Sequence, residues 1–133
     1  MQTTHPNIAL VHQFFQAYAD QDQAAISQLL APAIRWSIPG NHPLSGVKNG
    51  PDEVLFYLSQ LGRAAFQAKP IVVGVNDDYV IDCHYNWSNL AEGPQFAGMS
   101  CLLWKFADGK ISEVYNFPQD QHQVDSFFQN LYE

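Results

Sequence analysis

The chain has 133 residues, a formal net charge of −7 and 14% charged residues, where roughly 25% is usual. This length predicts one domain, residues 1–133, with room for a buried core. The six basic residues are scattered singly, so neither nucleic acid nor a membrane is expected as a partner. No run of about 18 apolar residues occurs in the sequence, so no transmembrane helix is expected.

The N-terminal sequence MQTTHPNIAL lacks the basic segment and the long apolar segment of a secretion signal. We therefore expect a cytoplasmic protein. Cys83 and Cys101 both lie in strand-like segments. Without a secretion signal, they are expected to be buried free thiols.

The first third of the chain predicts two helices. Apolar residues from Ile8 to Tyr18 recur at helical spacing, with Thr4 or Asn7 as the N-cap. Asp22 is expected to cap a second, short helix.

A short strand, Arg35–Ile38, and a loop rich in glycine and proline, residues 39–50, follow these helices. A third helix is expected to begin at Pro51, because proline is favoured at the first helical position. Asp52 and Glu53 then lie in its first turn, where the helix dipole favours acids.

The second half of the chain predicts strands separated by turn residues, of which Asp108-Gly109 is the strongest hairpin signal. The expected strands are Ile71–Val75, Tyr79–Ser88, Phe96–Phe106 and Lys110–Phe117. Apolar spacing from Val124 to Leu131 predicts a last helix. Helices followed by a strand meander favour an α+β fold, with helices on one face of an antiparallel sheet.

Two sequence segments indicate a particular protein family more specifically than this pattern of helices and strands does. They are Trp36…Pro39-Gly40…Pro43-Leu44-Ser45-Gly46 and Gly109-Lys110-Ile111-Ser112-Glu113-Val114…Phe117…Asp120. Together they resemble the SnoaL-like branch of the NTF2-like superfamily over residues 5–131. The resemblance implies a cone-shaped α+β domain, in which a curved antiparallel sheet wraps around about three helices and encloses a pocket. It implies a small, largely apolar ligand; relatives include polyketide cyclases and resemble ketosteroid isomerases.

The chain departs from the isomerase pattern at three places. Ser37 stands where that family has its base carboxylate, and Phe14 stands nearest to its oxyanion-binding tyrosine. Residues 96–106 contain no carboxylate to serve as the protonated aspartate. Steroid isomerase activity is therefore not expected.

The resemblance includes two other activities of this fold. The epoxide hydrolase version needs two aspartates bridged by an arginine, and neither Arg35 nor Arg63 lies on a late strand. The cyclase-like version has an aspartate near the end of the last strand, which makes Asp120 the candidate acid or base. The alternative for Asp120 is a helix N-cap with Gln123 at the third helical position.

Further candidates come from residue type and strand period. His42, in the glycine- and proline-rich loop, could shuttle a proton or be an exposed loop residue. Asp82 and His84 share one face of a strand and could form a dyad, with His84 preferred as a pocket-lining residue. The candidate ligand-binding residues are Trp36, Tyr57, His84, Trp104 and Tyr115, each with the core as its alternative. Lys105 prefers water, so the opposite face, with Trp104, is expected to turn inward.

No cofactor or metal is expected. The five histidines are scattered, no Cys-x-x-Cys spacing occurs, and the glycines match no phosphate-binding loop. Three functions stay open: a cofactor-independent cyclase, isomerase or dehydratase acting on a small apolar carbonyl compound; a non-catalytic ligand-binding protein; and a protein-interaction domain. The apolar residues left on the second face of the sheet predict a homodimer.

Overall fold

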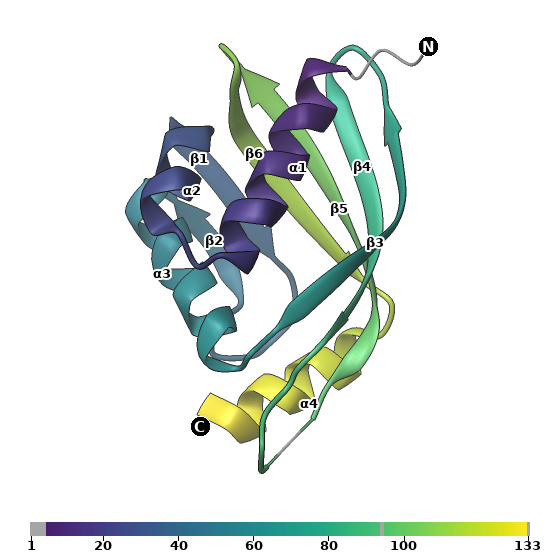
Figure 1. Cartoon of the computed structure of the whole chain (residues 1–133). Helices are drawn as coiled ribbons and strands as arrows, with labels where there is room; N and C mark the ends of the chain where they lie inside the picture. The colour runs from purple at the N-terminus through teal and green to yellow at the C-terminus, as the bar shows by residue number, and fades with distance from the viewer. Residues whose placement is uncertain (1–4, 94, 133) are drawn as a thin grey trace.

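The sheet of this protein is curved and open, and its helices lie inside the curve (Figure 1). The computed structural model describes residues 5–93 and 95–132. The elements within these residues are α1 (Pro6–Ala19), α2 (Gln23–Leu29), β1 (Leu30–Ile38), β2 (Gly46–Asn49), α3 (Gly50–Arg63), β3 (Gln67–Val75), β4 (Tyr79–Trp87), β5 (Ala97–Ala107), β6 (Lys110–Pro118) and α4 (Gln121–Tyr132). No helix among them is long and apolar enough to cross a membrane.

The strand order is β2-β1-β6-β5-β4-β3. β3 to β6 form an antiparallel meander, as predicted, and β1 pairs antiparallel with β2, whereas β1 and β6 pair in parallel. The sheet is therefore mixed. β1 and β6 can pair in parallel because they are far apart in the chain and are not joined by a hairpin, which would make them antiparallel. Helices α1 and α3 pack on the concave face, and α4 lies at one end of it (Figure 1). The cone expected from the resemblance is confirmed.

The caps explain where the helices begin. Asp22 accepts a hydrogen bond from the Ala25 N–H at 3.0 Å and caps α2, as predicted. The cap of α1 is His5, whose Nδ1 accepts from the Asn7 N–H. Asn7 therefore lies inside the helix instead of capping it, and Thr4 lies outside the described residues. Helix α3 begins one residue earlier than predicted, with Pro51 as its second residue.

Two strands begin earlier than predicted, and each includes a proline. β1 begins at Leu30 instead of Arg35 and includes Pro32, and β3 begins at Gln67 instead of Ile71 and includes Pro70. Each proline lies where the pairing register shifts, and β3 is an edge strand. Proline is tolerated at bulges and edges because no ladder hydrogen bond is lost there. The predicted loop of residues 39–50 also contains a short strand, β2.

The two faces of the sheet differ in burial. On β5, Leu102 and Trp104 are buried, whereas Met99 is 41% exposed. The face of β5 that carries Trp104 therefore turns inward. This was expected because Lys105, on the opposite face, prefers water. On β4, Asp82 and His84 face inward with it and are almost fully buried. Because side chains alternate along a strand, two polar side chains of β4 lie in an otherwise aromatic interior.

The turn after β1 is tied to α4 by hydrogen bonds. Asp125 accepts from the Asn41 N–H at 3.0 Å, and the Gln121 side chain donates to the Pro39 carbonyl at 3.3 Å. Gly40 lies beneath these two side chains with φ +102°, in the left-handed region that favours glycine. A methyl group at Gly40 would overlap Gln121 Nε2 and Asp125 Oδ1.

We expect Gly40→Ala to destabilise the protein more than Gly46→Ala. Gly46 has a similar φ of +110° and open space around it, so both variants lose about 1–2 kcal/mol to backbone strain. Gly40→Ala should lose about 1–2 kcal/mol more, because the new methyl displaces the hydrogen-bonded side chains of α4. Urea unfolding of the two variants measures the difference, and equal losses would contradict the contact between this turn and α4.

Candidate active site

An aspartate, a histidine and a tryptophan form a hydrogen-bonded chain on the inner face of β4 and β5. Asp82 Oδ2 lies 2.8 Å from His84 Nδ1, and the Trp104 Nε1–H donates to Asp82 Oδ1 at 2.5 Å. All three side chains are buried, with Asp82 only 1% exposed. Both oxygens of the carboxylate therefore have a donor, as a buried charge requires.

This arrangement fixes the histidine. A carboxylate only accepts hydrogen bonds, so the contact assigns the ring proton of His84 to Nδ1. The other nitrogen, Nε2, is then the basic one and is free to act on a ligand. Asp82 would also stabilise the imidazolium that forms when Nε2 takes up a proton. The pair can therefore act as a general base and then as a general acid.

A cavity of about 80 Å³ lies beside His84, between the sheet and α1 and α3. Its walls are mostly aromatic and aliphatic, and they also carry the side chains of two asparagines. The lining residues are Phe14, Phe15, Tyr18, Trp36, Tyr57, Leu58, Leu61, Phe66, Gln67, Ala68, His84, Asn86, Leu102 and Asn116. A wider hollow of about 430 Å³ shares Phe15, Tyr18 and Phe66 with it and also reaches Trp87. The two hollows therefore lie side by side, and only the smaller one is lined by His84.

Three polar atoms with almost no accessible surface, each on a residue that lines the cavity, have no hydrogen-bond partner in the part of the chain that the structure describes. They are Trp36 Nε1, Asn86 Oδ1 and Asn116 Oδ1. Buried polar groups in native proteins are nearly always paired with protein, water or ligand.

Two tyrosines contribute hydroxyl groups near the cavity. The Tyr18 hydroxyl donates to the Phe66 carbonyl at 3.1 Å and is committed to that contact. Tyr57 is buried, and burial raises the pKa of its hydroxyl. Tyr57 therefore keeps its proton and can donate a hydrogen bond to an oxygen of a ligand.

The structure brings three of the predicted site residues to this cavity, namely Trp36, Tyr57 and His84. Trp104 lies behind them: it anchors Asp82 and its ring contacts Phe14 at a centroid distance of 5.2 Å. Trp104 therefore acts on the site through Asp82, and not as part of the cavity wall.

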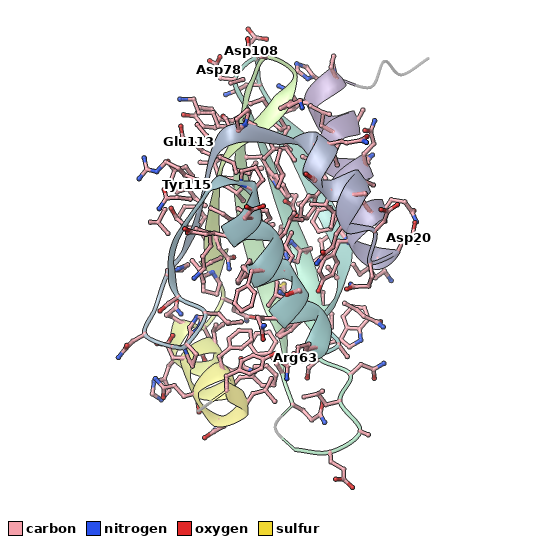
Figure 2. All side chains as sticks on the ribbon, turned by 90° about the vertical axis from the view of Figure 1, so that its left-hand side faces the viewer. Asp20, Arg63, Asp78, Asp108, Glu113 and Tyr115 are labelled. Carbon is pink, nitrogen blue, oxygen red and sulfur yellow. The ribbon has the colours of Figure 1, made fainter. Side chains whose placement is uncertain are left out.

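The other three predicted site residues lie elsewhere. Tyr115 projects from the outer face of β6 and donates to Glu113, on the side of the sheet away from α1 (Figure 2). Asp120 is exposed and accepts from the Gln123 N–H at 3.2 Å, which is the N-cap role considered as its alternative. The side chain of Gln123 donates to the Ala97 carbonyl of β5.

His42 is buried and not an exposed loop residue. Its ring lies 4.9 Å from that of Phe128 on α4, and its Nδ1 accepts from the Leu44 N–H at 3.1 Å. Burial lowers the pKa of His42, against the nearby charge of Asp125, which raises it. The residue therefore has a structural role in the loop, away from the cavity.

The sequence prediction missed the two asparagines. Asn86 continues the inward series of Asp82 and His84 at a spacing of two, and Asn116 lies two residues after the buried Val114. Strand period could have found both. The prediction of Tyr115 instead required the other set of alternate residues of β6 to face inward.

Comparison with known proteins identifies relatives across nearly the whole chain. The family model described as "SnoaL-like domain" matches residues 11–114. An uncharacterized protein of Mycobacterium tuberculosis is 28% identical over 129 residues, covering 95% of this chain and 98% of its own.

Solved structures with the same fold have lower identity. Bal32a, from a soil-derived mobile gene cassette, aligns with a TM-score of 0.87 at 21% identity, covering 92% of this chain and 96% of its own. TerC, co-crystallized with polyporic acid, aligns with a TM-score of 0.81 at 18% identity, covering 93% of this chain and 98% of its own. A candidate SnoaL-like polyketide cyclase of Jannaschia sp. CCS1 aligns with a TM-score of 0.79 at 16% identity, covering 97% of this chain and 98% of its own.

The position of His42 predicts a pH effect on stability. Its folded pKa is below the ordinary value, so the unfolded chain binds more protons and stability is lost as the pH falls below about 6.5. His42→Asn keeps an acceptor for the Leu44 N–H but cannot titrate. We expect the melting temperature of the variant to fall less than that of the wild type between pH 7 and pH 5. An equal fall in both proteins would contradict a buried, neutral His42.

Proposed function

The chain belongs to the SnoaL-like domain family, and we propose that it is a cofactor-independent enzyme for a small, largely apolar carbonyl compound. The observation that carries this proposal is the Asp82–His84 pair, joined at 2.8 Å beside a cavity with aromatic walls. In this proposal His84 transfers the proton, Asp82 orients and stabilises its ring, and the expected roles of Asp120 and His42 are not retained.

The proposed reaction is a proton transfer at carbon. His84 Nε2 removes a proton from the carbon beside a carbonyl group, and the electron pair of the broken C–H bond moves to the carbonyl oxygen as an enolate forms. Tyr57 can donate to that oxygen, and the imidazolium is stabilised by Asp82. Returning the proton to another carbon gives an isomerisation. In a cyclisation, the enolate carbon attacks a second carbonyl of the same molecule, the π electron pair of that carbonyl moves to its oxygen, and the His84 imidazolium protonates the resulting alkoxide.

The family supports a pocket for a small molecule, and two neighbours are consistent with a cyclic one. One is the candidate polyketide cyclase of Jannaschia, and the other is TerC, whose structure contains polyporic acid. The alternative is a non-catalytic binding protein, for which the same cavity with aromatic walls would serve. The proposed reaction needs no cofactor, and a cytoplasmic location stays a prediction from the sequence.

Hydrogen–deuterium exchange tests the reaction without knowledge of the natural substrate. 2-Tetralone has acidic protons beside its carbonyl, and in D₂O their exchange is followed by proton NMR. We expect the protein to accelerate this exchange, and Asp82→Asn and His84→Gln to lower the enzymatic rate by about 10²–10⁴-fold. Asp82→Asn keeps an acceptor for Trp104 but offers His84 an N–H group, which favours the wrong tautomer.

Asp120→Asn is the matched control, because asparagine caps a helix about as well as aspartate and Asp120 lies outside the cavity. It should keep the wild-type exchange rate. A wild-type protein without any acceleration would favour the binding-protein alternative. Full activity in a folded Asp82→Asn variant would remove the dyad from the mechanism.

We also propose that two copies of the chain associate through the outer face of the sheet. Ile81, Tyr85, Met99 and Phe117 are each more than 40% exposed on β4, β5 and β6. Cys83 and Cys101 pair across β4 and β5 on the same face and are half-buried free thiols, where buried ones were expected. An apolar face of this extent on a curved sheet is typical of a protein interface.

A charged substitution on this face should separate the copies. We expect light scattering to give twice 15.0 kDa for the wild type and a single chain for Phe117→Asp, because an unpaired carboxylate in an apolar interface is costly. Phe56→Asp is the control, since Phe56 is 64% exposed on α3, away from the sheet face. A wild-type protein of one chain at micromolar concentration would overturn the proposed dimer.

A further inference from the structure

Both cysteines of the chain lie directly opposite each other on neighbouring strands. Cys83 on β4 and Cys101 on β5 are partners in an antiparallel register that continues without a shift along the whole of β4 (Figure 1). Both are free thiols and half-buried. They take no part in the proposed proton transfer, because they lie on the other face of the sheet.

The two thiols turn to the same side of the sheet and contact each other. Their chain neighbours Asp82, His84 and Leu102 are buried on the inner face, so Cys83 and Cys101 turn outward. A hydrogen bond joins the two thiols. Burial is the main reason that the pKa of the Cys101 thiol is raised, and the contact with Cys83 adds to it. Cys101 therefore stays protonated at neutral pH, which slows its oxidation.

The spacing of opposite residues fits a disulfide, but with some strain. Their Cα atoms lie about 4.5–5.5 Å apart in antiparallel strands, within the range of about 4.4–6.8 Å for disulfides. Their Cβ atoms also lie about 4.5–5.5 Å apart, whereas a disulfide requires about 3.5–4.5 Å. Closure therefore brings the two strands together locally by up to about 1 Å. A strained disulfide is more easily reduced than a relaxed one.

The surroundings of the pair favour chemistry between the two sulfurs over metal binding. Val72 on β3 pairs with Cys83, and Phe117 on β6 pairs with Cys101, so apolar side chains flank the thiols. Val72 is 61% exposed and Phe117 is 54% exposed. Among residues 5–93 and 95–132, no group of three or more histidine, cysteine, aspartate or glutamate side chains could hold a metal ion.

We propose that Cys83 and Cys101 are a redox-responsive pair, which closes to a disulfide within one chain and reopens under reducing conditions. The oxidant is a low-molecular-weight disulfide. One cysteine thiolate attacks a sulfur of this molecule, a small thiolate leaves, and a mixed disulfide forms. The second cysteine thiolate then attacks the protein sulfur of the mixed disulfide, and the second small thiolate leaves. In total the protein loses two hydrogen atoms, and the small disulfide becomes two thiols.

Closure of the pair reaches the inner face of the sheet. Cys83 lies between Asp82 and His84 in the chain. Its partner Cys101 precedes Leu102, which pairs with Asp82. An approach of β4 to β5 at this point displaces the peptide units that carry the Asp82–His84 contact, because packed interiors transmit strain. The redox state of the outer face is thereby linked to the orientation of the His84 ring.

Oxidised glutathione tests the proposal at about pH 8.5, where more of the Cys101 thiol ionises than at neutral pH. The protein is kept below micromolar concentration, which favours single chains with an uncovered outer face and disfavours links between chains. We expect the loss of both free thiols, a mass lower by two hydrogen atoms, and a linked pair of peptides that contains Cys83 and Cys101. Excess reduced glutathione should restore both thiols. The NMR signals of the His84 ring should shift on oxidation and return on reduction.

Two variants with a single thiol are the matched controls. Cys83→Ser and Cys101→Ser each keep one cysteine and replace the other by a side chain of similar size that cannot form a bond to sulfur. Each variant should stop at the mixed disulfide, which adds the mass of one glutathione to the chain. Neither should form a linked pair of peptides within one chain.

Four results would overturn the redox-responsive pair: unchanged thiols, glutathione retained on both cysteines, a covalent dimer on a non-reducing gel as the main product, or a disulfide that excess reduced glutathione does not reopen. Unchanged His84 signals after closure would refute the link to the inner face. None of these measurements depends on the exchange of 2-tetralone protons. The proposed function can therefore fail while the redox-responsive pair survives, and the reverse result is equally distinct.

Discussion

The buried carboxylate of Asp82 is the constraint on which the interior of this protein depends. A charge at 1% exposure is tolerated only when donors replace its lost hydration. Trp104 and His84 supply those donors from β5 and β4. Trp104 is itself fully buried and contacts the rings of Phe14 and Trp36. The aromatic core therefore holds the tryptophan, the tryptophan holds the carboxylate, and the carboxylate holds the imidazole in one orientation. The packing of the core and the orientation of the His84 ring depend on the same contacts, so a change in the core would also move the Asp82–His84 pair.

The two faces of the sheet carry different kinds of side chains. The concave face carries the polar groups of β4, β5 and β6 under the cover of α1 and α3, where the low polarity of the surroundings strengthens each hydrogen bond. The convex face carries apolar side chains without such cover, among them Ile81 and Phe117. Both features follow from the same alternation of side chains along a strand. They also explain the composition, because a chain with 14% aromatic and only 14% charged residues has apolar surface for a core, a cavity wall and an outer face together.

Much of the fold could be predicted from the sequence, because its signals are local. The Asp22 cap, the Asp108-Gly109 hairpin and the inward face of Trp104 each depend on a few neighbouring residues. The site was harder to predict because it depends on register between strands that are distant in the chain. A shift by one residue exchanges the two faces, which is why Tyr115 was expected inside whereas Asn116 lines the cavity. The residue type alone could not show this, since an aromatic side chain suits either face of this sheet.

The cavity also has a cost that bears on its function. An unpaired polar atom in a protein interior is unfavourable by about 1–3 kcal/mol, and the cavity places Trp36 Nε1 and Asn116 Oδ1 in that condition. Leucine at position 116 and phenylalanine at position 36 would fill similar volumes without any unpaired group. A sequence selected for stability alone has little reason to keep the polar pair beside a cavity of about 80 Å³. Ordered water is an ordinary partner for such buried groups in native proteins.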